Sequence, residues 1–181
     1  RDRSVSRGLG DVYKRQNLLI PYTSNYAGTL LPGIREYTVT PGEKTTTISG
    51  KGKAGLKQEE NYYFFYLPVC YKGITGKSYA YYNTSRSKNL YLPASVDENY
   101  SYDIQLPENL TLCTPIQEKK IDNPIGSFKI TLTSEGSSLH IELALQIKKQ
   151  LITPAEYPAF RSLITEWTDR TRKPILFKTV Q

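Results

Sequence analysis

Two neighbouring runs of alternating residues constrain this chain more than any other feature of its sequence. They span residues 128–133 and 139–148, and Ser134-Glu135-Gly136-Ser137 between them has the composition of a turn. A period of two gives each strand one apolar face and one mostly polar face. Because an apolar face must be buried against a second layer, we predict a β-hairpin within an antiparallel β-sandwich. The apolar positions are Phe128, Ile130, Leu132, Leu139, Ile141, Leu143, Leu145 and Ile147.

Further strand signals surround this hairpin. Tyrosine is abundant, with 15 residues, and 11 prolines and 12 glycines interrupt the chain, which is typical of a β protein with many turns. Tyr100, Tyr102, Ile104 and Leu106 alternate with polar residues and predict a half-buried strand. The run NYYFFYLPVC at residues 61–70 predicts a buried strand with a bulge or an edge at Pro68. Shorter strands are predicted at Glu36–Thr40, Thr45–Ser49, Lys88–Pro93 and Ile175–Lys178.

Helical periodicity occurs once, near the C-terminus. Phe160, Leu163, Ile164 and Trp167 form one apolar stripe. Thr153 and Glu156 have capping-box spacing with Pro154 at the first helical position, and Pro158 is expected to shift or kink the start of the helix. The sequence therefore predicts a mainly β fold, an antiparallel β-sandwich with one C-terminal α-helix, at about residues 154–169, packed on it.

The first sixteen residues do not resemble natural protein. Ser6 to Gln16 reads SRGLGDVYKRQ, which resembles the translation of a transposase-based sequencing adapter. We expect residues 1–16 to be an adapter-derived artefact, residues 17–60 to be a lead-in with short strands and a Gly/Lys loop, and residues 61–181 to be the C-terminal β-sandwich domain. The chain has no methionine, so we expect it to begin inside a gene, with any signal peptide missing.

Charge and hydropathy exclude two classes of partner. The formal net charge of +7 falls to +4 when the five basic and two acidic residues of positions 1–16 are set aside. The remaining charges are scattered, so no nucleic-acid partner is expected. No apolar run approaches the roughly 18 residues of a membrane span. Gly50 and Gly55 have the spacing of a phosphate-binding loop, but Leu56 and Lys57 occupy the positions that such a loop gives to Lys and Ser or Thr.

The residue types that carry chemistry are scarce. His140 is the only histidine, and it falls on the polar face of an alternating strand, where an exposed surface residue is expected. Cys70 and Cys113 lack a histidine or basic motif beside them, and two interpretations stay open: one disulfide, or two small buried residues. Neither a carboxylate pair nor a metal-ligand cluster stands out. The sequence thus predicts no catalytic residue, no metal ligand and no cofactor.

Tyrosines form the most suggestive binding signal. Seven crowd into about twenty residues: Tyr62, Tyr63, Tyr66, Tyr71, Tyr79, Tyr81 and Tyr82. Exposed tyrosines stack on sugar rings or anchor protein partners, whereas alternate tyrosines of a strand are often core residues. A surface-binding module for a glycan or protein ligand is therefore one hypothesis.

The order of elements resembles a known family. Arg86 precedes YSYDIQLP (Tyr100 to Pro107), the hairpin, ITPAEYPAFRSLITEW (Ile152 to Trp167) and ILFK (Ile175 to Lys178), with Tyr157, Pro158 and Arg161 as the most specific positions. This arrangement is similar to the C-terminal domain of unknown function that follows the core of bacterial transglutaminase-like proteins. The resemblance implies a non-catalytic, accessory β domain. Its partner would be an upstream transglutaminase-like Cys-His-Asp domain of the same parent chain, and its location the periplasm or cell surface.

Overall fold

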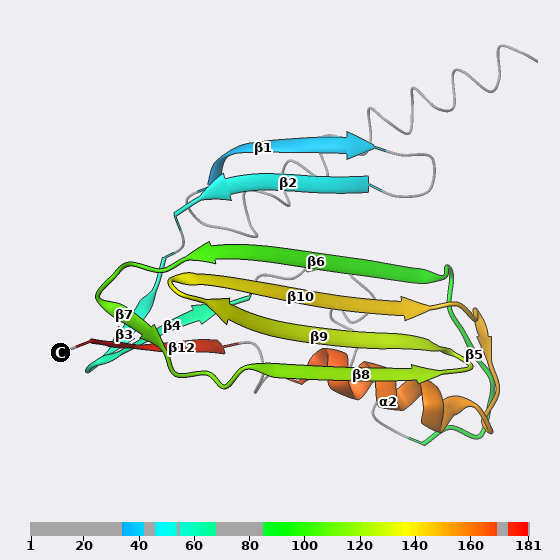
Figure 1. The fold of residues 1–181 in the computed structure, drawn as a ribbon. Coiled ribbons are helices and arrows are strands. Elements are labelled where there is room, and N and C mark those ends of the chain that lie inside the picture. The colour runs from blue at the N-terminus through cyan, green and yellow to red at the C-terminus, as the bar shows by residue number, and fades with distance from the viewer. Residues whose placement is uncertain (1–33, 42–45, 54, 68–84, 170–173, 181) are drawn as a thin grey trace, which may run out of the picture. The chain divides into compact units, whose positions relative to one another are not determined.

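The computed structural model describes residues 34–41, 46–53, 55–67, 85–169 and 174–180. The chain divides into two units, Arg1–Gly55 and Leu56–Gln181. In the first unit, β1 (Ile34–Pro41) and β2 (Thr46–Gly52) form an antiparallel hairpin (Figure 1). This confirms both strands predicted before residue 50. β2 also includes Gly50, Lys51 and Gly52, which were expected to begin a flexible loop. Residues 1–16 lie outside the described residues, and the predicted boundaries at residues 16 and 60 stay predictions.

The second unit contains a four-stranded antiparallel sheet in the order β6-β10-β9-β8 (Figure 1). Leu143 lies opposite Tyr100 on one side and Ile130 on the other, so the alternating apolar residues of three strands share one face. The predicted hairpin and the strand predicted at residues 100–106 are confirmed. The four strands are β6 (Val96–Gln105), β8 (Gln117–Asn123), β9 (Gly126–Glu135) and β10 (Ser138–Ile147).

Strand β8 was not predicted from the sequence. Its inward positions are Gln117, Lys119, Ile121 and Asn123, so only one of the four is apolar. An edge strand with this composition gives no period-two hydrophobic signal. The backbone pairing with β9, with Ile121 opposite Phe128, is what places the strand in the sheet.

The turn between β9 and β10 is tighter than predicted. Glu135 pairs with Ser138, so only Gly136 and Ser137 remain between the strands, and the predicted four-residue turn begins two residues too early. Gly136 has a φ of +57°. Two-residue hairpin turns need a positive φ at their first central position, and glycine adopts it without steric strain.

A second sheet, in the order β3-β4-β12-β7, lies on the same side of the first sheet as the helix (Figure 1). Its inward residues Phe65, Ile175 and Phe177 are buried. The strand predicted at residues 175–178 is confirmed. The strand predicted at residues 61–70 is confirmed at Tyr62–Tyr66, where Phe65 is buried and Tyr62 and Tyr66 are exposed. Pro68, where a bulge or an edge was predicted, lies outside the described residues. The bounds are β3 (Lys57–Glu59), β4 (Tyr62–Tyr66), β7 (Leu110–Leu112) and β12 (Pro174–Thr179); β5 (Leu90–Tyr91) pairs separately with β11 (Leu151–Ile152).

The helix α2 (Tyr157–Thr168) begins three residues later than predicted. Thr153 O accepts a hydrogen bond from Tyr157 N at 3.0 Å, which closes one preceding turn. Pro158 has no N–H with which to continue that pattern, so the regular helix starts beside it. The Glu156 carboxylate accepts a hydrogen bond from Thr153 N at 3.0 Å, as the capping-box spacing predicts. Hydrogen bonds, first from Lys149 and then from Thr153, lower the pKa of Glu156 to about 2.

The apolar stripe of α2 packs on the first sheet as predicted. Asn123 Nδ2 also donates to Ala159 O at 3.0 Å, and Lys119 Nζ lies 2.5 Å from Glu166 Oε1, so the polar inward residues of β8 also contact the helix. The fold is thus a mainly β, antiparallel sandwich with one C-terminal helix. The buried cluster around α2 comprises Leu90, Leu92, Ile125, Phe128, Ile130, Leu143, Leu145, Ile147, Ile152, Tyr157, Phe160, Leu163, Ile164 and Trp167.

Candidate functional site

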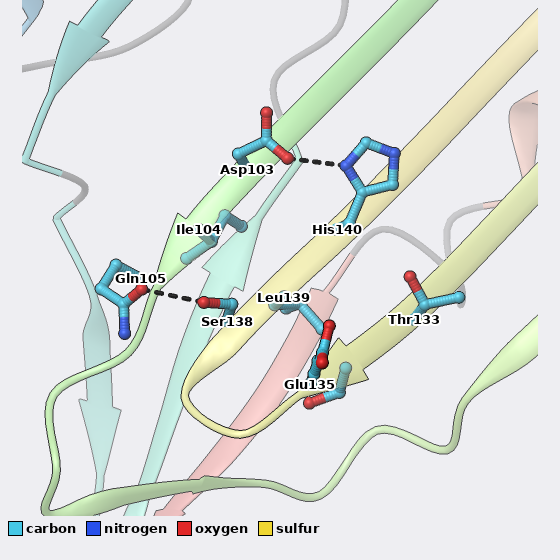
Figure 2. Close-up of a pocket in the computed structure, with 9 residues that line it drawn as sticks. Asp103, Ile104, Gln105, Thr133, Glu135, Ser138, Leu139 and His140 are labelled. Carbon is cyan, nitrogen blue, oxygen red and sulfur yellow. Dashed lines mark hydrogen bonds and ion pairs between the residues drawn. The ribbon is translucent and has the colours of Figure 1, made fainter.

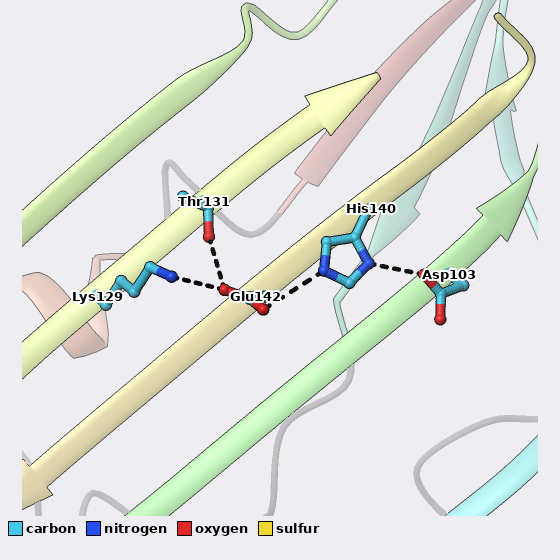
Figure 3. Close-up of polar contacts among 5 residues, drawn as sticks. All are labelled: Asp103, Lys129, Thr131, His140 and Glu142. Atoms are coloured by element: carbon cyan, nitrogen blue, oxygen red, sulfur yellow. Dashed lines mark hydrogen bonds and ion pairs between the residues drawn. The ribbon is translucent and has the colours of Figure 1, made fainter. Parts of the chain in front are cut away.

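The polar face of the β6-β10-β9-β8 sheet carries the only histidine of the chain within a cross-strand network (Figure 3). His140 Nδ1 lies 2.7 Å from Asp103 Oδ1, and His140 Nε2 lies 3.6 Å from Glu142 Oε1. On the other side of Glu142, Lys129 Nζ donates to Oε2 at 2.7 Å and Thr131 Oγ1 donates to the same oxygen at 3.3 Å. Three neighbouring strands thus contribute one continuous row of polar contacts.

Strand register creates this network. His140 lies directly opposite Asp103, and Glu142 lies opposite Thr131. The prediction that His140 occupies the polar face is confirmed, and its side chain is 43% exposed. Its carboxylate partners were not predicted. The alternation places Asp103 on the polar side of its strand, but only the pairing shows which residues lie opposite one another.

The charges of the network stabilise one another. The hydrogen bond with Asp103 is the largest cause that raises the pKa of His140, and Glu142 adds to it. The hydrogen bond from Lys129 is the largest cause that lowers the pKa of Glu142. Both shifts favour the charged forms, so the imidazolium and the carboxylate coexist over a wider pH range than either would in isolation.

This arrangement does not suit general-base catalysis. A catalytic histidine of a Cys-His or Ser-His pair presents one nitrogen to the nucleophile and the other to an orienting carboxylate. Here each ring nitrogen of His140 faces a carboxylate, so neither nitrogen is presented to a nucleophile. The geometry therefore indicates a cross-strand contact that contributes to pairing of β6 with β10.

We expect His140→Gln to make thermal stability less dependent on pH. A raised pKa in the folded chain stabilises it below the ordinary value of 6.5, and this contribution is lost as pH rises through the folded-state pKa. Thermal unfolding between about pH 5 and about pH 9 measures the effect. The Tm of the unsubstituted chain should exceed that of the His140→Gln variant near pH 5, and this difference should disappear near pH 9.

Gln146→Ala, on the same face of β10 as His140, is the matched control. Its Tm should change with pH in the same way as the Tm of the unsubstituted chain. Glu142 sets the lower limit of the pH range over which His140 can be tested. Because its pKa is lowered, its contribution is present above the ordinary value of 4.5 and is lost as pH falls through the folded-state pKa. A Tm difference between the unsubstituted chain and H140Q that stays constant over the whole pH range would contradict a pH-dependent contribution of His140 to stability.

A shallow hollow adjoins His140 at the turn end of the sheet (Figure 2). Ser138 Oγ donates to Gln105 Oε1 at 3.0 Å across it. Within the hollow, Ser138 is thus engaged with Gln105 and His140 with Asp103, both across the β6–β10 pair. The lining residues are Asp103, Ile104, Gln105, Thr133, Ser134, Glu135, Ser138, Leu139 and His140.

The tyrosine cluster is only partly within the described residues. Tyr62 and Tyr66 are exposed on one face of β4, and Tyr63 is half-buried on the other. The remaining four, Tyr71, Tyr79, Tyr81 and Tyr82, lie outside the described residues. The structure therefore confirms exposed tyrosines at two of the seven positions.

Of the two cysteines, only Cys113 lies in the part of the chain that the structure describes. Cys113 is half-buried, and its Sγ lies 4.0 Å from the carbonyl oxygen of Thr111. Cys70 lies outside the described residues, so a disulfide between the two stays a prediction. Across the described ranges, no group of three His, Cys, Asp or Glu side chains is arranged to hold a metal ion. Within the same ranges, no helix is both long and apolar enough to cross a membrane.

Fold and site together define a β-sandwich domain whose one histidine is held between two carboxylates. The chain belongs to the family DUF3858, a domain of unknown function with a solved structure, whose model matches residues 61–177. This agrees with the predicted resemblance to a domain of unknown function. A search of curated proteins gives no match.

The chain is also similar to a solved structure. That structure is of a protein from Parabacteroides distasonis described as a "putative protease". The two are 31% identical, with a TM-score of 0.58. The similarity covers 67% of this chain and 24% of the other, so the chain spans about a quarter of the length of that protein.

Proposed function

We propose that this chain is the non-catalytic, accessory β domain of a longer transglutaminase-like protein. A Cys-His-Asp core for acyl transfer or peptide cleavage would lie upstream in the same parent chain, and the domain would brace that core or help to present substrate. The resemblance of the closing elements to the C-terminal domain of such proteins also favours a location in the periplasm or at the cell surface.

The state of His140 carries the non-catalytic part of this proposal. Acyl transfer by a cysteine requires an imidazole nitrogen within hydrogen-bond reach of the thiol or thiolate. Both nitrogens of the one histidine in the chain face carboxylates instead. The related protein from Parabacteroides distasonis supports the accessory part, because the matched segment is only 24% of a chain described as a protease.

We expect the purified chain to show no turnover in two assays, cleavage of a fluorogenic casein substrate and incorporation of a labelled amine into casein. His140→Ala and Cys113→Ala serve as the deciding variants, because neither side chain is fully buried. Turnover that either substitution abolishes would show that this chain carries the chemistry, and would overturn the non-catalytic assignment.

The sequence of the intact gene tests the accessory role separately. A domain with Cys, His and Asp in transglutaminase-like order before residue 17 is the expected finding. An unrelated neighbour at that position would contradict the assignment to a transglutaminase-like protein, even if this chain itself proved inactive.

A further inference from the structure

The outer face of the β3-β4-β12-β7 sheet carries a row of aromatic side chains on a single strand. Tyr62, Phe64 and Tyr66 alternate with the inward residues of β4, so all three point away from the core. We call these three residues the aromatic strip. Tyr62 is 44% exposed and Tyr66 is 54% exposed.

Strand pairing surrounds the strip with both polar and apolar neighbours. On the β12 side, Leu176 lies opposite Phe64 and Lys178 lies opposite Tyr62. On the β3 side, Lys57 lies opposite Phe64 and Glu59 lies opposite Tyr62. Phe64 and Leu176, both half-buried, form an apolar floor between the two exposed tyrosines.

The strip is not needed for the core. The inward residue Phe65 of the same strand is 7% exposed and fills that role. A single exposed aromatic, such as Tyr91 at 68% exposure, is ordinary, but several in one row on a sheet face indicate a binding surface.

The charges around the strip disfavour a charged partner. Lys57 and Lys178 are balanced by Glu59 and Glu60, so the formal charges of the surrounding residues cancel. A surface for a nucleic acid or another polyanion would instead carry an excess of one sign.

The size of the face disfavours a protein partner. The four strands have 3, 5, 6 and 3 residues. At about 3.3 Å per residue and about 4.8 Å between strands, the face covers on the order of 300 Å². A stable protein interface buries about 800 Å² on each side. The aromatic rings therefore suit a narrow, uncharged ligand better than a second protein.

A shallow hollow beside the strip offers the polar groups that such a ligand needs. It is lined by Glu59, Glu60, Tyr62 and Phe64. Carboxylate oxygens accept hydrogen bonds from hydroxyl groups, and an aromatic face beside them packs against the C–H groups of a sugar ring. At the other end of the aromatic strip, Lys57 Nζ lies 5.5 Å from the centroid of the Tyr66 ring, a cation–π contact that orients this ring.

We propose that the aromatic strip binds a neutral polysaccharide. The rings of Tyr62 and Tyr66, about 13 Å apart along the strand, stack on sugar units of one chain, and Glu59 and Glu60 accept hydrogen bonds from its hydroxyl groups. This site lies on a different face from the His140 network and does not depend on the accessory role proposed above.

Affinity electrophoresis of the full chain in native gels tests this proposal. The probes are three neutral polysaccharides (xyloglucan, galactomannan and dextran), with polygalacturonate as the anionic comparison. We expect at least one neutral polysaccharide to retard the chain and polygalacturonate not to do so. Tyr62→Ala and Tyr66→Ala should each weaken retardation at least about fivefold, which corresponds to about 1 kcal/mol of stacking per ring.

Two sets of variants separate stacking from other effects. Tyr91→Ala removes a more exposed tyrosine outside the strip and should leave retardation unchanged. Tyr62→Phe and Tyr66→Phe keep the ring and should retain most of the binding. All of these positions are exposed, so circular dichroism should show an unchanged fold for each variant.

Three results would overturn the proposal. The first is the absence of retardation by all three neutral polysaccharides. The second is equal retardation of the parent and the Y62A/Y66A double variant. The third is self-association in size-exclusion chromatography that Y62A/Y66A abolishes, which would make the strip an interface between two copies of the chain.

Discussion

Gly126→Ala is expected to destabilise the second unit by about 3 kcal/mol or more, or to prevent its folding. A Cβ added at this buried residue would lie 1.8 Å from the carbonyl oxygen of Gln146 and 3.1 Å from the Cα of Ile147. Both are backbone atoms of the paired strand β10, so no side-chain rotation relieves the clash. Small domains are stable by only about 5–15 kcal/mol, so this loss is large. Urea unfolding, followed by circular dichroism, measures it.

Two other glycines provide controls for this substitution. At Gly55, an added Cβ meets nothing within 4 Å, and alanine should change stability by less than about 0.5 kcal/mol. At Gly136, space is also open but φ is +57°, so alanine should cost about 1 kcal/mol through backbone strain. If Gly126→Ala were no worse than Gly136→Ala, the close approach of β9 and β10 would be wrong.

Phe160→Ala should cost about 3–5 kcal/mol, which is the usual range for deleting a buried phenylalanine. Phe160 is 0% exposed in the cluster between α2 and the first sheet. Its ring centroid lies 5.8 Å from that of Tyr157 on the preceding turn. Removal leaves a cavity at the position where α2 is anchored, and the loss of helix packing should follow.

Trp167, the only tryptophan of the chain, reports this unfolding through its fluorescence. Its ring lies 6.5 Å from that of Phe128 and 5.9 Å from that of Tyr100, so its emission depends on contact between α2 and the sheet. Tyr66→Ala is the exposed aromatic control and should shift the midpoint little. A loss below about 1 kcal/mol for Phe160→Ala would contradict the anchoring of α2 by this residue.

Elements with one clearly apolar face were predicted correctly from the sequence. The β9–β10 hairpin, β6 and the apolar stripe of α2 each repeat with the period of their secondary structure, and that period reflects burial directly. Strand β8 was missed because polar side chains occupy most of its inward positions, where Lys119 and Asn123 contact α2. The helix α2 begins three residues after the predicted position because the capping box at Thr153 closes a single turn, and the expected shift of the helix start at Pro158 is confirmed.

The functional surfaces were less predictable than the fold. The sequence places His140 on a polar face and identifies an unusual density of tyrosines. Neither observation shows that His140 is held by Asp103 and Glu142, or that the face of β4 with Tyr62 and Tyr66 is the outward one. Alternation shows which residues of a strand share a face, but contacts across strands depend on register.

The sequence by itself therefore determined the fold class, the strand faces and the residues that form most of the core, because hydrophobic periodicity is a local property. Only the tertiary structure decided which polar residues meet. Asp103 and His140 are 37 positions apart along the chain, yet their side-chain atoms are 2.7 Å apart. That proximity follows from the pairing of β6 with β10, which the whole sheet and its buried face fix together.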